Sequence, residues 1–79
     1  MTNIEKLNQI FCEVFSVEPL ALDSLFNKDN VEGWDSVRQL NLTTSVEDTF
    51  DIMLDVEDII GFNSYDKAKE ILNKYDIEL

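Results

Sequence analysis

Residues 33–50 read GWDSVRQLNLTTSVEDTF, and this stretch predicts the central helix of the fold. Asp35 is a favourable N-cap, because its carboxylate accepts hydrogen bonds from the free amides of the first turn and complements the helix dipole. The helix is therefore expected to run from Ser36 to about Asp51. Side chains spaced about 100° apart form its expected core face: Leu42, Val46 and Phe50, flanked by Gln39 and Thr43.

A second face of this helix combines a hydroxyl group with apolar and acidic side chains. In chain order it carries Ser36, Val37, Leu40, Thr44, Glu47, Asp48 and Asp51. A serine that follows an aspartate at a helix start is in most proteins a structural residue that helps to begin the helix. The neighbours on this face open a second interpretation, in which the hydroxyl is a site on which another enzyme acts.

The rest of the chain predicts three further helices around the central one. Apolar residues at helical spacing indicate an amphipathic helix over residues 3–16. A long connection over residues 17–35, expected to carry a short helical turn, leads to the central helix. A short helix over residues 55–61 and a final helix from Tyr65 complete the pattern. The short helix is expected to pack through Val56, Ile59 and Ile60. We expect an all-α four-helix bundle with three longer helices, one short helix and a long first loop, folded as one domain of 79 residues.

The charge of the chain limits the partners that it can bind. Its formal net charge is −11 at pH 7, with 17 acidic and 6 basic residues, and such a chain repels nucleic acid and anionic lipid. No apolar segment is long enough for a membrane span, and no secretory signal is visible. The single cysteine, Cys12, fits a reducing compartment. We therefore expect a cytoplasmic monomer whose acidic surface docks proteins with basic patches.

The residue types argue against an enzyme. Nucleophilic catalysis by serine needs a base, usually histidine, and the chain has none. No spacing of ligand-type residues fits a metal site, since the stretch 27–33 fails the calcium-loop pattern at Val31. Paired carboxylates such as Glu47 and Asp48 could in principle do acid–base work, but such neighbours are far more often solvated. We expect neither intrinsic catalysis nor a metal centre.

Over nearly its whole length the chain resembles the acyl carrier protein family, the phosphopantetheine-binding carrier domains. The family motif is Asp-Ser-Leu, followed by a helix that ends in an acidic pair and Phe. Here Asp-Ser-Val at positions 35–37 and Glu-Asp-Thr-Phe at positions 47–50 match it. The first helix, the long loop, the acidic segment 55–58 and the final helix also agree.

The resemblance implies that Ser36, in the motif with Asp35, carries 4′-phosphopantetheine, transferred from coenzyme A by a Mg²⁺-dependent phosphopantetheinyl transferase. Acyl-loading and acyl-processing enzymes with basic patches would then be partners, in fatty-acid, polyketide or another specialised biosynthetic pathway. The implied docking surface consists of Val37, Leu40, Thr44, Glu47, Asp48, Asp51, Val56, Glu57 and Asp58. Candidates for lining an acyl chain are Leu42, Val46, Ile59, Ala68 and Ile71, whose simpler interpretation is ordinary core.

The chain departs from the family pattern at three positions. Members that serve fatty-acid synthesis usually have Gly-Ala-Asp-Ser-Leu followed by an acidic residue, whereas this chain has Trp34, Val37 and Arg38. A tryptophan at this position, beside the serine, is similar to what carriers of specialised pathways have. This resemblance favours a carrier dedicated to one such pathway over the housekeeping carrier of fatty-acid synthesis. By helical angle, Arg38 points away from the centre of the docking face. The alternative from another functional class is an unmodified acidic helical interaction module that binds a basic protein partner.

Overall fold

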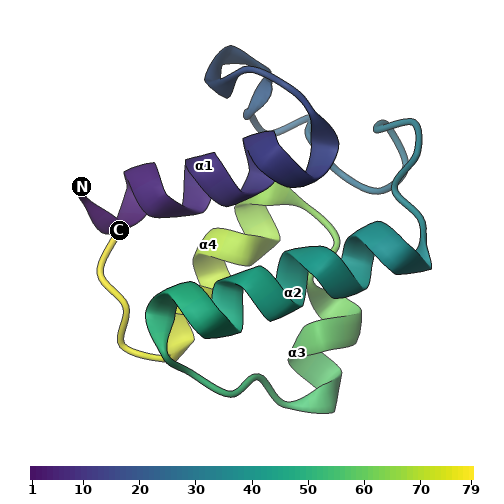
Figure 1. The fold of residues 1–79 in the computed structure, drawn as a ribbon. Coiled ribbons are helices and arrows are strands. Elements are labelled where there is room, and N and C mark those ends of the chain that lie inside the picture. Colours follow the sequence, from purple (N-terminus) through teal and green to yellow (C-terminus); the bar gives the residue numbers. More distant parts are fainter.

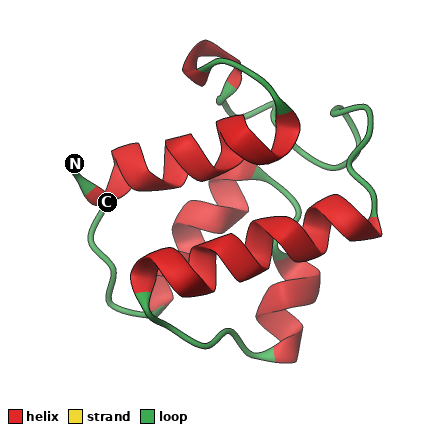
Figure 2. Cartoon of the chain, viewed as in Figure 1, coloured by secondary structure: helices red, strands yellow, loops and turns green.

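Four α-helices and one 3₁₀ turn account for the regular structure of the chain, which the computed structural model describes over residues 1–79 (Figure 1). In chain order they are α1 (Asn3–Phe15), the 3₁₀ turn η1 (Pro19–Ala21), α2 (Ser36–Phe50), α3 (Val56–Gly61) and α4 (Tyr65–Lys74). Loops make up the remainder, and there is no strand (Figure 2). The predicted all-α fold with three longer helices, one short helix and a long first loop is confirmed. None of the helices is long and apolar enough to cross a membrane.

The helix ends are set by local capping. Thr2 and Glu5 form a capping box at the start of α1, in which each side chain accepts from the other residue's backbone N–H. Ser64 is the N-cap of α4, and its hydroxyl oxygen accepts from the Lys67 N–H. Ser16 and Asp51 end α1 and α2 in the left-handed conformation, with φ of 56° and 53°. Because these signals are local, the predicted bounds of the first two helices are confirmed to within one residue.

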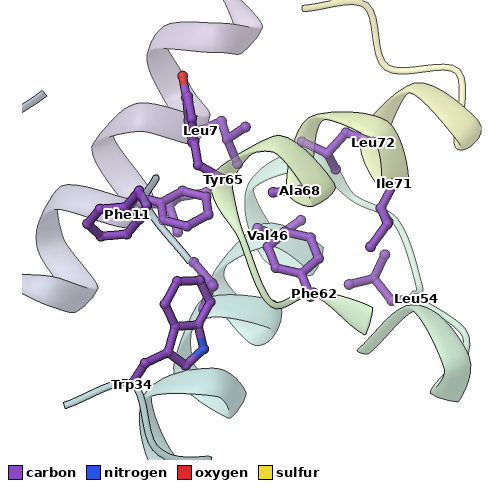
Figure 3. Packing of buried hydrophobic residues seen from close by; sticks show 13 residues of the cluster. Leu7, Phe11, Trp34, Val46, Leu54, Phe62, Tyr65, Ala68, Ile71 and Leu72 are labelled. Carbon is purple, nitrogen blue, oxygen red and sulfur yellow. The ribbon is translucent and has the colours of Figure 1, made fainter. Parts of the chain in front are cut away.

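An aromatic cluster around Phe11 forms the centre of the core (Figure 3). The Phe11 ring is fully buried, and its centroid lies 5.4 Å from that of Tyr65, 5.8 Å from that of Phe26 and 6.3 Å from that of Trp34, all edge to face. The other buried apolar residues are Leu7, Ile10, Leu42, Val46, Leu54, Phe62, Ala68, Ile71 and Leu72. Two of the aromatic rings, Phe26 and Trp34, belong to the long loop, so this loop is itself part of the core.

Backbone hydrogen bonds also hold the long loop against the start of α4. The carbonyl of Phe26 accepts from the Tyr65 N–H at 2.9 Å, and the Lys28 N–H donates to the Asn63 carbonyl at 2.9 Å. An isolated antiparallel bridge joins Asn27 to Ser64 at the same place. These bonds and the buried rings of Phe26 and Trp34 hold the long loop to the rest of the fold.

The short helix α3 packs through fewer residues than its sequence predicts. Val56 is 72% exposed and Ile60 is 73% exposed, and only Ile59 packs in part against the core. The predicted core contacts of Val56 and Ile60 are therefore wrong. A helix of six residues completes fewer than two turns, so only a narrow side of it can face the core.

The two ends of the chain lie next to each other (Figure 1). The side-chain amide of Asn3 donates to the Glu78 carbonyl at 2.8 Å, which ties the C-terminal segment to the start of α1. The start of α2, where Ser36 lies, is at the opposite side of the molecule.

Candidate functional site

Ser36 is the first residue of α2, and its side chain is exposed. Asp35 precedes it as the N-cap, with extended backbone, and its Oδ1 accepts from the Arg38 N–H at 2.9 Å. The expected capping role of Asp35 is confirmed. The hydroxyl of Ser36 therefore lies at the positive end of a 15-residue helix dipole, where an added negative group is stabilised.

The Arg38 side chain folds back over the turn that precedes Ser36. Its Nη1 donates to the Gly33 carbonyl at 2.9 Å and lies 3.7 Å from Oδ2 of Asp35. Gly33 has φ of 84°, and a Cβ there would lie 3.4 Å from Arg38 Nη1, so glycine suits both the turn and this contact. The guanidinium is thus directed toward residues 33–35, the turn that immediately precedes Ser36.

Trp34, which precedes the cap, is a core residue. It is 6% exposed, and its ring centroid lies 4.7 Å from that of Phe15. Its indole N–H donates to Oε1 of Gln39 at 2.6 Å. The presence of tryptophan beside Ser36 therefore has a packing reason, which weakens its value as a sign of a particular pathway.

Most of the residues expected to form the docking surface are exposed. Val37 and Leu40 of α2 are 67% and 61% exposed, as expected for a docking role. Of the other expected docking residues, five are also exposed: Thr44, Asp48, Asp51, Val56 and Glu57. Met53 and Ile60 are also exposed apolar side chains, which sequence reasoning missed, because neither the short linker nor the six-residue α3 has enough residues to define a face.

Glu47 has a structural role as well as an expected docking role. It is half-buried, and its Oε2 accepts from the Leu54 N–H at 2.9 Å. This bond closes the turn that links α2 to α3. Only part of the Glu47 carboxylate is therefore available to a partner.

Asp58 does not fit the docking role that the sequence suggested. It is 8% exposed, and its carboxylate accepts from Nζ of Lys74 at 2.9 and 3.0 Å and from the Tyr75 hydroxyl at 2.6 Å. The Tyr75 oxygen in turn accepts from the Asp55 N–H at 3.0 Å. Asp58 therefore ties α3 to the end of α4, and its charge is used inside the protein.

The Asp58→Asn variant is expected to be less stable than the wild type at neutral pH, with a difference that vanishes on acidification. Hydrogen bonds from Tyr75 and Lys74 lower the pKa of the Asp58 carboxyl below its unfolded-chain value of about 3.9. Such a group contributes stability that is fully present above the unfolded value and is lost as pH falls through the folded value. Urea unfolding from neutral pH to about pH 2 measures the difference. The exposed variant Asp48→Asn is the control, and an equal loss in both variants would contradict this role.

The five candidates for an acyl pocket lie in or against the packed core. Leu42, Val46 and Ala68 are fully buried, Ile71 nearly so, and Ile59 is half-buried. The three surface depressions of the structure are lined by other residues. All five candidate residues are therefore ordinary core residues in this structure.

Comparisons with protein-family models, with curated proteins and with solved structures find no match to this chain. Its function must be inferred from its own residues.

Proposed function

We propose that this chain is an acyl carrier protein in which Ser36 carries 4′-phosphopantetheine. The observation that supports this best is an exposed serine hydroxyl at the first residue of α2, next to exposed apolar and acidic side chains. When attached, the group supplies a terminal thiol that holds acyl intermediates as thioesters. The chain itself would present the loaded group to acyl-loading and acyl-processing enzymes of fatty-acid, polyketide or another specialised biosynthesis.

The surroundings of Ser36 suit the attachment of a phosphate ester. Oγ of Ser36 would bond to the phosphorus that carries the pantetheine arm, and the P–O–P bridge of coenzyme A would break. Adenosine 3′,5′-bisphosphate, which contains the other phosphorus of the bridge, would leave. The proton of the hydroxyl would pass to a base on the transferase, since this chain has no histidine. The helix dipole of α2 and the nearby Arg38 guanidinium would stabilise the negative phosphodiester that remains.

The thiol of the chain itself is poorly suited to carry acyl groups. Cys12 is half-buried on α1, and burial, together with the nearby carboxylates of Glu13 and Glu18, raises the pKa of its thiol. The thiolate is the nucleophile in thioester chemistry, so a raised pKa reduces reactivity. An attached arm would supply the reactive thiol instead.

The test is the intact mass of the purified chain after incubation with coenzyme A, Mg²⁺ and a broad-specificity phosphopantetheinyl transferase. A gain of one phosphopantetheine supports the carrier. No gain with several transferases, on protein shown to be folded, would overturn the carrier and favour the alternative, an unmodified acidic interaction module that binds a basic protein. The acidic character of the chain, whose formal net charge is −11 at pH 7, is compatible with either function.

The carboxylate of Asp51 is expected to speed the encounter with the transferase. Asp51→Asn should lower kcat/KM for loading by about two- to five-fold at low salt, the effect of one exposed charge pair, and by less at high salt. Asparagine tolerates the left-handed conformation at this position, so the fold is kept.

Asp76→Asn is the matched control for this measurement. Asp76 follows α4, is exposed and has φ of 65°, so the substitution removes the same charge from the same backbone conformation at a position outside the expected docking residues. An equal fall in both variants would show that net charge matters and that the position of Asp51 does not.

A further inference from the structure

The side-chain amide of Gln39 joins three parts of the molecule. Gln39 lies in the first turns of α2, and its Oε1 accepts from the indole N–H of Trp34 at 2.6 Å. Its Nε2 donates to the Ile59 carbonyl at 2.8 Å and to the Phe62 carbonyl at 2.6 Å. The indole N–H can only donate and the carbonyls can only accept, so the orientation of the amide is fixed by its partners.

The two carbonyls that Gln39 binds are at the C-terminal end of α3. The last carbonyls of a helix have no partner within the helix and need one from elsewhere. A short helix gains little from its own hydrogen bonds, and α3 has only six residues, of which Val56 and Ile60 are largely exposed. Gln39 therefore holds the C-terminal end of α3, while Asp58, Lys74 and Tyr75 hold the rest of it to α4.

We infer that Gln39 is a positioning residue that fixes α3 relative to Ser36. Gln39 is three residues from Ser36 on the same helix and binds Trp34, two residues before Ser36. One side chain thereby sets the placement of the exposed α3 residues with respect to the hydroxyl. One consequence rests on the proposed function. An enzyme that reacts at Ser36 while it contacts α3 needs the hydroxyl and α3 at a fixed distance and orientation from each other.

Two variants test separately the bond of Gln39 to Trp34 and its bonds to the carbonyls of Ile59 and Phe62. Gln39→Glu keeps the acceptor for Trp34 but loses the donor and places a carboxylate against the two carbonyl oxygens. Trp34→Phe keeps an aromatic ring and both bonds to α3 but removes the indole N–H. Gln39→Asn, which is one methylene shorter and adds no charge, replaces Gln39→Glu in the comparison should that variant not fold.

Segment-resolved hydrogen–deuterium exchange is the first measurement. Gln39→Glu is expected to lower the protection of residues 55–62 by about tenfold or more relative to the rest of the chain, because the Phe62 carbonyl loses its donor. Trp34→Phe, which truncates a core side chain, is not expected to single out that segment. The chain has one tryptophan, so its single indole N–H signal in NMR reports whether the Trp34 bond is kept in Gln39→Glu. The control is Ile10→Val, a core truncation in α1, which should lower protection throughout the chain without singling out residues 55–62.

Loading kinetics is the second measurement. Gln39→Glu is expected to raise the KM of the transferase for this chain several-fold with kcat nearly unchanged, because the reacting hydroxyl is intact and the docking arrangement is loosened. Unchanged exchange of residues 55–62 in Gln39→Glu, with the wild type loaded normally, would overturn the inference and leave the carrier function standing. A wild type that no transferase loads would overturn the carrier function, and the exchange experiment would still decide the role of Gln39.

Discussion

Replacing Ser36 by alanine is expected to abolish phosphopantetheine loading completely and to leave the fold intact. The substitution removes only Oγ, the atom that would form the phosphate ester. The side chain is exposed, and Asp35 caps the helix, so neither a cavity nor a lost cap follows. Exposed substitutions of this kind change stability by about 0.5 kcal/mol or less. Intact mass after incubation with coenzyme A, Mg²⁺ and transferase measures loading, and thermal unfolding followed by circular dichroism measures the fold.

The control for this experiment is Ser24→Ala, which removes another exposed hydroxyl, in the long loop, and should load like the wild type. A Ser36→Ala protein that still gains one phosphopantetheine would show that the group is attached elsewhere. A Ser36→Ala protein that is unfolded would show that the serine has a structural role larger than its position suggests.

Replacing Phe11 by alanine is expected to destabilise the fold more than any exposed substitution. Phe11 is fully buried and packs against aromatic rings of the long loop, the segment before α4 and α4 itself, including Phe26, Phe62 and Tyr65. Phe→Ala substitutions in a core cost about 3–5 kcal/mol. The whole domain of 79 residues has a free energy of unfolding of roughly 4–12 kcal/mol, at about 0.05–0.15 kcal/mol per residue.

Phe11→Ala is therefore expected to remove at least about a quarter of the free energy of unfolding, and to unfold the domain if that free energy is at the lower end of the range. Urea and thermal unfolding measure the loss, and Leu20→Ala, at a side chain that is 90% exposed, is the control with an expected change of about 0.5 kcal/mol or less. A Phe11→Ala protein as stable as the Leu20→Ala control would contradict the central place of this ring in the core.

The helices could be predicted from the sequence because their signals are local. The cap at Asp35 and the apolar spacing of Leu42 and Val46 lie within a few residues of what they determine, and the structure confirms both. The burial of the Trp34 side chain could not be predicted in the same way. Its burial depends on rings of α1 and the long loop, which only the tertiary arrangement brings together.

The candidate site could be predicted in part, for the same physical reason. The exposed position of Ser36 follows from its place at a helix start. The burial of Asp58 depends on Lys74 and Tyr75, which are 16 and 17 residues away in the chain. The connection made by Gln39 spans 20 residues to Ile59, so no local pattern indicates it. Loading of Ser36 and docking by partners stay predictions that the experiments above decide.

The adjacent chain ends have a practical consequence for how this protein can be fused to another domain or immobilised. The bond between Asn3 and Glu78 holds both ends at one side of the molecule, and Ser36 lies at the other (Figure 1). A linker to a neighbouring domain, an affinity tag or a solid support joined at either end would leave the serine facing outward. A short peptide could also join the two ends and new ends could be opened in an exposed loop, giving a circular permutant with the same fold.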